Sequence, residues 1–375
     1  MRRLAATPRS DWQSRVEAQG MTFHTLDDGS PYWNESVFYE FEGREVDAIE
    51  KATYALNEIC LAAVEQVFQR SLLRQFGVPD AFAGWLEKSW NTDEITIYGR
   101  YDLLYDGQSP PKMVEFNADT PTALLEASVI QWHWLEDTQP RGDQFNSIHE
   151  RLIEAWQRLK PTLNGTLYFS AMEDHLEDTM TAAYLRDTAM QADIITESLS
   201  IERIGWNAAR HQFVDDHQRP IGHIFKLYPW EWMLREQYGP YLPQAGTRWL
   251  EPPWKMLLSC KAILPLLWEM YPNHPNLLSA DWKPLPGVCV EKPVHGREGA
   301  NIRILDDGKP RFATEGPYAG GATIFQEFFP TPRLDDHSSV IGSWLVNGYA
   351  CGMGIREDSG LVTGNTSRFV PHVLA

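Results

Sequence analysis

Oxygen-bearing side chains alternate along residues 112–126, KMVEFNADTPTALLE. Glu115 and Asn117 stand two positions apart, and side chains with that spacing share one face of a strand. Upstream, Arg100 and Asp102 have the same spacing in the segment YGRYD. The intervening segment contains Asp-Gly and Pro-Pro and is long enough to return the chain as an antiparallel partner. The sequence therefore predicts a hairpin on which these four side chains converge.

Two carboxylates and an amide oxygen form a hard ligand set that suits Mg²⁺, which nucleotide phosphates often complete. An arginine in the same patch suits an anionic group that bridges the metal and the guanidinium. The alternative is an exposed polar hairpin face that carries an ordinary Arg/Asp ion pair.

A second motif is the glycine-containing segment VEKPVHGREGANI at residues 290–302. A glycine loop between antiparallel strands can offer backbone N–H groups to phosphates, while Lys292 and Arg297 add positive charge. It lacks the Walker pattern, and such a loop can equally be a simple turn. Lys261 opens an apolar helical stretch, where it is either a further phosphate-binding cation or an ordinary solvated residue.

The elements that must position these residues fall into two halves. Apolar periodicity predicts a long helix over 45–76 with a stop at Gly77, and it also predicts a helix–strand–helix unit, typical of an α/β lobe, over 148–159, 166–170 and 176–192. In the last third, short strand patterns with hairpin turns predict antiparallel β structure over 287–292, 301–305, 310–313, 322–325 and 340–346.

Composition narrows the classes of partner. The formal net charge is −18, from 33 basic and 51 acidic residues, and its field would repel nucleic acid and anionic membranes. The four cysteines show no C-x-x-C pair, which indicates reduced thiols. No apolar stretch has the length of a membrane span or a leader. We therefore expect a cytoplasmic protein without nucleic-acid or membrane partners.

Seven segments resemble, in order, the synthetase domain of glutathionylspermidine synthase, an ATP-grasp ligase: YGRYDLLYD, VEFNADTPT, KLYPWEWM, SCKAILPLLWEMYP, EKPVHGREGANI, FQEFF and GIREDSGLVTGNTSRFVP. The resemblance covers nearly the whole chain. It implies an α+β or α/β, ATP-grasp-like fold with a mixed or antiparallel β nucleotide-binding half and a glycine-loop lid. It also implies one synthetase unit over 1–375, with the lid and nucleotide-binding lobe at about 255–335.

The resemblance further implies a role for each matching residue. Arg100 corresponds to the transition-state arginine, and Asp102, Glu115 and Asn117 correspond to the magnesium ligands. The ATP site would comprise Lys261 and Lys292 at the phosphates, Glu298 and Gly299 in the loop above them, Gln326, Glu327, Phe328 and Phe329 at the adenine, and Leu361, Val362 and Thr363 closing the pocket. The substrate side would comprise Thr120, Glu177 or Asp178, and Arg356, while Asp119 would be a turn or cap residue.

The sequence departs from the family pattern in two places. Leu227 replaces a substrate-contacting threonine, which removes a hydrogen bond and predicts a different substrate preference. No cysteine–histidine hydrolase region precedes residue 90, so hydrolysis of the product is not expected.

The expected activity is the ATP- and Mg²⁺-dependent joining of a small carboxylate or peptide to an amine through an acyl phosphate. A homodimer is compatible with this interpretation. The alternatives are a nucleotide-binding module without turnover and an ATP-dependent phosphotransferase without ligation.

Overall fold

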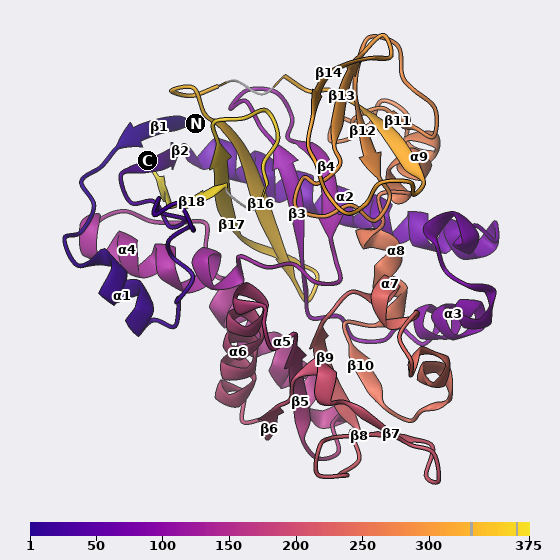
Figure 1. Ribbon diagram of the computed structural model, residues 1–375. Coiled ribbons are helices and arrows are strands. Elements are labelled where there is room, and N and C mark those ends of the chain that lie inside the picture. Colours follow the sequence, from indigo (N-terminus) through magenta and orange to yellow (C-terminus); the bar gives the residue numbers. More distant parts are fainter. Residues whose placement is uncertain (331–332, 365–366) are drawn as a thin grey trace.

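The computed structural model describes residues 1–330, 333–364 and 367–375 as a mixed α/β structure with several sheets (Figure 1). Its central sheet has five antiparallel strands in the order β18-β17-β16-β3-β4. Their bounds are β3 (Tyr98–Leu104), β4 (Lys112–Asn117), β16 (Ser338–Val346), β17 (Tyr349–Asp358) and β18 (Arg368–Val370). In the β3–β4 hairpin Arg100 lies opposite Asn117, and Asp102 lies opposite Glu115. The predicted hairpin is therefore confirmed.

The long helix α2 (Gly43–Gln69) packs against the central sheet. The Thr53 and Ser343 hydroxyl oxygens are 2.6 Å apart, and the Tyr101 hydroxyl donates to Asn57 Oδ1 at 3.3 Å. The helix ends earlier than predicted because Ser71 adopts a left-handed conformation with φ of 55°, which an α-helix cannot continue. A short 3₁₀ turn at Leu73–Phe76 follows.

A second antiparallel sheet, in the order β11-β15-β12-β13-β14, lies beside the central sheet (Figure 1). Its strands are β11 (Ala280–Asp281), β12 (Val288–Pro293), β13 (Arg303–Asp306), β14 (Lys309–Ala313) and β15 (Thr323–Glu327). The strands predicted for the last third are confirmed here and in β16. This sheet lies within the lobe predicted at about 255–335, of which residues 331–332 lie outside the described part of the chain.

A third sheet is parallel, in the order β10-β9-β5-β6, and lies on the opposite side of the molecule from the second (Figure 1). Its strands are β5 (Leu167–Ala171), β6 (Thr196–Ser198), β9 (His223–Leu227) and β10 (Arg248–Leu250), and helices α5 (Ile148–Leu159) and α6 (Leu176–Gln191) accompany it. The predicted helix–strand–helix unit is confirmed. The chain leaves β5 for β6 on one side and reaches β9 on the other, an arrangement that opens a crevice at the carboxyl ends of the strands.

The remaining elements close the molecule around two large hydrophobic clusters. A sheet in the order β1-β2-β19 brings the first and last described strands together (Figure 1). The elements not yet given are β1 (Arg2–Ala5), β2 (Val37–Phe41), β7 (Gly205–Asn207), β8 (Gln212–Val214), β19 (His372–Leu374), α1 (Trp12–Ala18), α3 (Ala83–Asn91), α4 (Gln131–Thr138), α7 (Trp230–Met233), α8 (Met256–Ser259) and α9 (Ile263–Met270).

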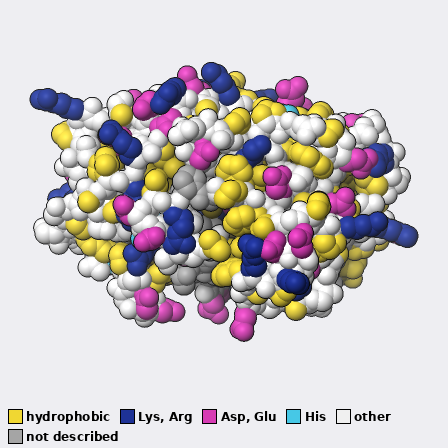
Figure 2. Space-filling model, turned by 90° about the horizontal axis from the view of Figure 1, so that it is seen from above, with side chains coloured by type: hydrophobic (Ala, Val, Ile, Leu, Met, Phe, Trp, Pro, Cys, Tyr) yellow, Lys and Arg dark blue, Asp and Glu magenta, His cyan; other side chains and the backbone are white. Residues whose placement is uncertain are grey.

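The surface seen from above mixes acidic and basic side chains, with hydrophobic side chains between them (Figure 2). The acidic excess therefore does not form a patch of one sign on that face. In the described ranges, no helix combines the length and apolarity needed to cross a bilayer.

Candidate active site

The carboxylate of Asp102 is the centre of a polar cluster on the β3–β4 hairpin. It accepts hydrogen bonds from Arg100 Nε at 2.6 Å, from an Arg356 terminal nitrogen at 2.7 Å and from Asn117 Nδ2 at 3.2 Å. Arg100 and Asp102 are both buried. The alternative interpretation is therefore wrong about exposure, although the Arg/Asp ion pair that it included is present.

Glu115 connects the hairpin to the glycine loop through Lys261. The Lys261 ammonium lies 2.7 Å from Glu115 Oε2 and donates to the Gly296 carbonyl at 2.7 Å. Burial raises the pKa of Glu115, but the Lys261 and Lys292 ammonium groups outweigh it and hold that pKa below its ordinary value. Lys261 is itself buried just before α9, so its interpretation as a solvated residue is wrong.

Lys292 extends from β12 toward the same hairpin. Its ammonium donates to Gln326 Oε1 on β15 at 2.6 Å and to the Val114 carbonyl at 3.4 Å. Gln326 in turn donates to the Met113 carbonyl at 3.1 Å. Burial lowers the pKa of Lys292 to about 7 against the attraction of Glu115. Lys292 and Gln326 therefore join the second sheet to the central one through buried polar groups.

The glycine loop between β12 and β13 lies against two other segments. Gly299 has φ of 68°, and a Cβ atom on it would lie 2.5 Å from the Thr363 carbonyl oxygen. Arg297 donates to Thr120 Oγ1 at 3.0 Å and to Glu231 Oε1 at 2.6 Å. The loop is thus held to the segment that contains Thr363 on one side and to the wall that contains Thr120 on the other.

These groups surround one cavity of about 820 Å³. Every site residue predicted from the sequence lines it: Arg100, Asp102, Glu115, Asn117, Thr120, Glu177, Asp178, Lys261, Lys292, Glu298, Gly299, Gln326, Glu327, Phe328, Phe329, Arg356, Leu361, Val362 and Thr363. Leu227, the departure from the family pattern, lines it too. Their convergence is a structural finding, whereas their individual roles remain predictions.

A buried acid beside the cavity residues Tyr32 and Glu177 was not predicted. Glu126 is 1% exposed and accepts a hydrogen bond from the Tyr32 hydroxyl at 2.8 Å. Burial and the nearby Glu177 carboxylate raise the pKa of Glu126 to about 7. Its signal in the sequence is a single carboxylate inside the apolar run TALLEASVI.

Asp119 has a larger structural role than the predicted turn or cap. It accepts a hydrogen bond from the Trp230 N–H at 2.9 Å, at the first residue of α7, whose N-cap residue is Pro229. Its carboxylate also lies 2.5 Å from the Lys226 ammonium, and both side chains are fully buried. This ion pair anchors the hairpin to the parallel sheet.

The donor set fits Mg²⁺. Asn117 Nδ2 is 3.2 Å from both Asp102 Oδ2 and Glu115 Oε1, and the two amide orientations of Asn are nearly isosteric. Rotation of that amide would direct its oxygen to the point between the carboxylates, where a cation would replace the N–H donor. Across the described ranges, no group of three or more His, Cys, Asp or Glu side chains gathers as a metal site, and the set on the hairpin consists of two carboxylates and one amide.

This arrangement of buried cations beside a pair of carboxylates is suited to a polyphosphate and its divalent cation. Comparison with known proteins gives the class. The family model "Glutathionylspermidine synthase preATP-grasp" matches residues 3–375. The chain therefore belongs to the glutathionylspermidine synthase family, whose matched members are ligases that form carbon–nitrogen bonds.

A Haemophilus influenzae protein named "Putative acid–amine ligase" is 41% identical over 390 residues, covering 99% of each chain. The trypanothione synthetase of Crithidia fasciculata is 27% identical over 84% of this chain and 53% of its own length. The bifunctional glutathionylspermidine synthetase/amidase of Escherichia coli is 28% identical over 86% of this chain and 57% of its own length. The chain thus spans little more than half of the latter two relatives.

Proposed function

We propose that the protein is an ATP- and Mg²⁺-dependent acid–amine ligase on an ATP-grasp-like fold, acting through an acyl phosphate. The observation that carries the proposal is the convergence of Asp102, Glu115 and Asn117 with three buried cations, Arg100, Lys261 and Lys292, around one cavity. A site with this balance of charge can hold a triphosphate and its metal ion together.

In the proposed reaction, a carboxylate oxygen of the acid attacks the γ-phosphorus of ATP and ADP leaves, which forms an acyl phosphate. The amine nitrogen then attacks the acyl carbon, inorganic phosphate leaves and the nitrogen loses a proton. The products are an amide, ADP and phosphate. Each step moves negative charge between phosphate oxygens, so positioned cations contribute most of the catalysis.

Asp102, Glu115 and Asn117 would hold Mg²⁺, which supplies positive charge to the phosphate oxygens when bound. Lys292 approaches the same region from the second sheet and Lys261 from the turn before α9, and we assign both to the phosphates. Arg100 donates to Asp102 and to the Thr122 carbonyl at 2.6 Å, and these bonds fix the plane of its guanidinium. A fixed guanidinium can stabilise charge on the transferred phosphoryl group without reorganising.

The nucleotide end of the cavity combines apolar and polar surface. Val290 and Ile304 from the second sheet line it together with Phe328 and Leu361. We assign this apolar slot to the adenine and the loop around Gly299 to a lid over the phosphates. Exclusion of water by such a lid protects an acyl phosphate from hydrolysis.

The substrate end lies at the carboxyl ends of β5 and β9, where the strand order of the parallel sheet reverses. We assign Glu177 and Asp178 to the ammonium group of the amine. Burial raises the pKa of Asp178 to about 6, against the attraction of His175, so this carboxyl is largely ionised at pH 7. Thr120 and Arg356 are assigned to the acid substrate, and Leu227 offers that substrate an apolar contact.

The test is ADP release and product mass measured over panels of small carboxylates or peptides and amines, with and without Mg²⁺. Ligation predicts ADP, phosphate and an amide only when acid, amine and metal are all present. A phosphorylated acceptor without an amide would establish a phosphotransferase instead. Bound ATP without turnover across all pairs would overturn the proposal in favour of a binding module.

A further inference from the structure

Two arginines contact Asp102, and the protein holds the first of them, Arg100, firmly. Its Nε donates to Asp102 Oδ1 at 2.6 Å, one terminal nitrogen donates to Asp102 Oδ2 at 3.2 Å, and the other donates to the Thr122 carbonyl at 2.6 Å. Its stem packs closely on Gly342 of β16, where an added Cβ atom would lie 2.7 Å from Arg100 Cδ. All three guanidinium nitrogens and the stem of Arg100 are therefore fixed.

The second arginine, Arg356, extends from β17 and has a single partner. One terminal nitrogen donates to Asp102 Oδ2 at 2.7 Å, and within residues 1–330, 333–364 and 367–375 no other hydrogen bond or ion pair holds this guanidinium. A guanidinium has five N–H donors, so most of those of Arg356 are unused. Its side chain is 22% exposed, against 8% for Arg100, and it lines the first cavity, which contains the proposed ligation site. Arg356 can therefore leave Asp102 more readily than Arg100.

Asp102 Oδ2 is also an oxygen that the proposed metal ion needs. Asn117 Nδ2 lies 3.2 Å from it and 3.2 Å from Glu115 Oε1, so the proposed metal position lies between these two oxygens. A carboxylate oxygen has about two lone pairs, and Oδ2 already accepts from Arg100, Arg356 and Asn117. A divalent cation would compete with these donors and would repel the guanidinium groups. The guanidinium held least firmly is that of Arg356.

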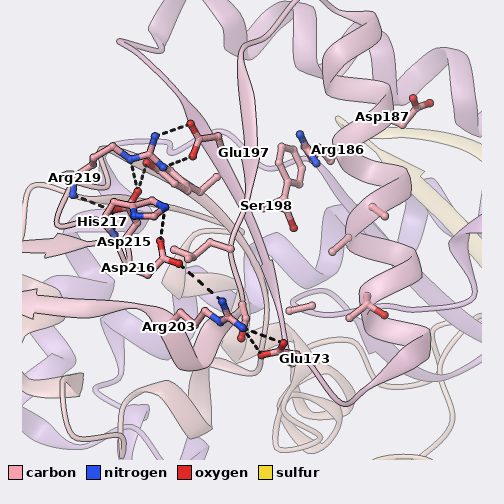
Figure 3. Close-up of a pocket in the computed structure, with 18 of the residues that line it drawn as sticks. Glu173, Arg186, Asp187, Glu197, Ser198, Arg203, Asp215, Asp216, His217 and Arg219 are labelled. Atoms are coloured by element: carbon pink, nitrogen blue, oxygen red, sulfur yellow. Dashed lines mark hydrogen bonds and ion pairs between the residues drawn. The ribbon is translucent and has the colours of Figure 1, made fainter.

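Arg219 is an arginine of the opposite kind. It lines a second cavity, of about 640 Å³, on the parallel sheet, where it pairs with Glu197 and, through Nε at 2.6 Å, with Asp215 (Figure 3). The described residues that line this second cavity include none that is assigned above to the metal or the phosphates. Arg219 therefore serves as a reference arginine in the same chain, remote from the proposed metal position.

We propose that Arg356 is a metal-dependent latch on the acid-substrate site. Its guanidinium binds Asp102 when no cation is present. A divalent cation that binds with ATP at Asp102, Glu115 and Asn117 displaces it, and the released guanidinium binds the carboxylate of the acid. This inference rests on the proposed function and adds an order of binding, in which the metal–nucleotide complex precedes the acid.

The latch couples the two ends of the first cavity in both directions, because coupling between binding sites is reciprocal. An acid that arrives first meets a guanidinium already paired with Asp102, so it binds weakly. Once the acid is bound, it keeps Arg356 from returning to Asp102 and thereby strengthens metal binding by the same factor. The acid is thus held mainly in the complex that can phosphorylate it.

The first experiment measures metal affinity in the full chain. Mn²⁺ binding, alone and with the nonhydrolysable analogue β,γ-methylene-ATP, is followed by the EPR signal of free Mn²⁺, with Mg²⁺ as the competitor. Arg356→Gln should bind Mn²⁺ at least about five-fold more tightly than the unmodified chain, because a competitor for Asp102 is removed. A role of Arg356 in structure alone would not raise metal affinity.

Arg333→Gln is the matched control. Arg333 also lines the first cavity, but its guanidinium donates to the backbone carbonyls of Asp336 and Ser359. The variant therefore removes the same charge without removing a donor to Asp102, and Mn²⁺ affinity should change by less than about two-fold. Equal Mn²⁺ affinities in the two variants would overturn the latch. Absence of Mn²⁺ binding by the unmodified chain would overturn the metal site, and the proposed function with it.

The second experiment uses the unmodified chain and so does not depend on the folding of a variant. Phenylglyoxal modifies accessible guanidinium groups, and peptide mass spectrometry measures the rate at each arginine. With β,γ-methylene-ATP present throughout, addition of Mg²⁺ should raise the rate at Arg356 at least about five-fold and leave the rate at Arg219 unchanged. An unchanged or lower rate at Arg356 would overturn its release.

The order of binding is tested with the acid that gives the highest ligation rate in the panel described above. Calorimetry should show that this acid binds the unmodified chain at least about ten-fold more tightly with Mg²⁺ and the analogue than with neither. Arg356→Gln should lose this difference. Equal affinity in both conditions, in a chain that ligates the same acid, would overturn the order of binding and leave the proposed function intact.

Discussion

The Lys261 ammonium lies 2.7 Å from the Glu115 carboxylate and joins the start of α9 to strand β4. Lys292 acts on the same carboxylate from β12. One acidic side chain therefore balances two buried cations from different parts of the chain. Its removal should affect both the metal and the phosphate ends of the proposed site.

Glu115→Gln should lower kcat for ATP-dependent ligation by about 100-fold or more while leaving the fold intact. The substitution removes one proposed metal ligand and leaves Lys261 and Lys292 to repel each other. ADP release and Mg²⁺ titration calorimetry measure the two losses. Glu291→Gln is the matched control, because Glu291 pairs with Arg303 at 2.8 Å outside the cavity. Near-normal ligation by Glu115→Gln would contradict the site assignment.

Gly299→Ala should raise the KM for ATP by about ten-fold or more, because a Cβ atom would lie 2.5 Å from the Thr363 carbonyl oxygen and displace the loop. Gly308→Ala is the control: Gly308 also has a positive φ, of 80°, but nothing lies within 4 Å of the added Cβ. Both variants should lose about 1–2 kcal/mol of stability from backbone strain. Equal KM values in the two variants would exclude a role for the Gly299–Thr363 contact.

Asp119→Asn should lower the free energy of unfolding by about 3–5 kcal/mol, because it leaves the buried Lys226 ammonium without its counter-charge. Burial already lowers the pKa of Lys226 in the folded protein. The unfolded state therefore binds more protons at Lys226. The contribution of Lys226 to the free energy of unfolding rises with pH up to the ordinary pKa of lysine. Urea titrations at pH 7 and pH 9 should show part of the loss recovered at the higher pH.

The control for Asp119→Asn is Asp193→Asn, which removes an exposed carboxylate 3.6 Å from Lys160. Exposed pairs of this kind contribute at most about 1 kcal/mol. If Asp119→Asn unfolded at the same urea concentration as Asp193→Asn, the Lys226 pair would not anchor the hairpin.

Glu126→Gln should weaken the pH dependence of stability. The pKa of Glu126 is about 7 in the folded protein against an ordinary value of 4.5. The folded state therefore binds more protons between these values, and Glu126 lowers stability progressively as pH rises from about 4.5 to about 7. The shift corresponds to about 3 kcal/mol. Tyr32, Glu177 and Arg100 face this carboxyl and remain in the variant.

Thermal unfolding of Glu126→Gln between pH 5 and pH 8 should show a smaller decline in stability than the unmodified chain. Glu150→Gln, an exposed change on α5, should retain the full decline. The same slope in both variants would show that Glu126 is not the titrating group.

The sequence was sufficient for features determined by local pattern. Alternation of side chains and a turn of suitable length predicted the β3–β4 hairpin, whereas most of the predicted residues that line the first cavity followed from the resemblance to a family. The end of α2 could not be predicted, because a serine in the sequence does not indicate the left-handed backbone conformation that Ser71 adopts. The helical patterns at 148–159 and 176–192 were long enough to give accurate bounds.

Contacts between elements that are far apart in the sequence could not be predicted from local patterns. Lys261 lies in the turn before α9 and its partner Glu115 lies on β4, and the charge at Asp119 is balanced only where the parallel sheet meets the hairpin. Among these unpredicted features, only the burial of Glu126 had a local signal, because Glu126 is a single carboxylate in an apolar run.

The Asp102–Arg356 contact spans 254 residues of sequence, and the whole of the β11–β15 sheet is encoded between β4 and β16. During synthesis on the ribosome, β3 therefore cannot pair with its neighbour β16 until β11 to β15 have emerged. Contacts of such long range close late in folding. A growing chain would thus acquire its glycine loop before the central sheet is complete, and the full set of groups around Asp102 would form only near the end of translation.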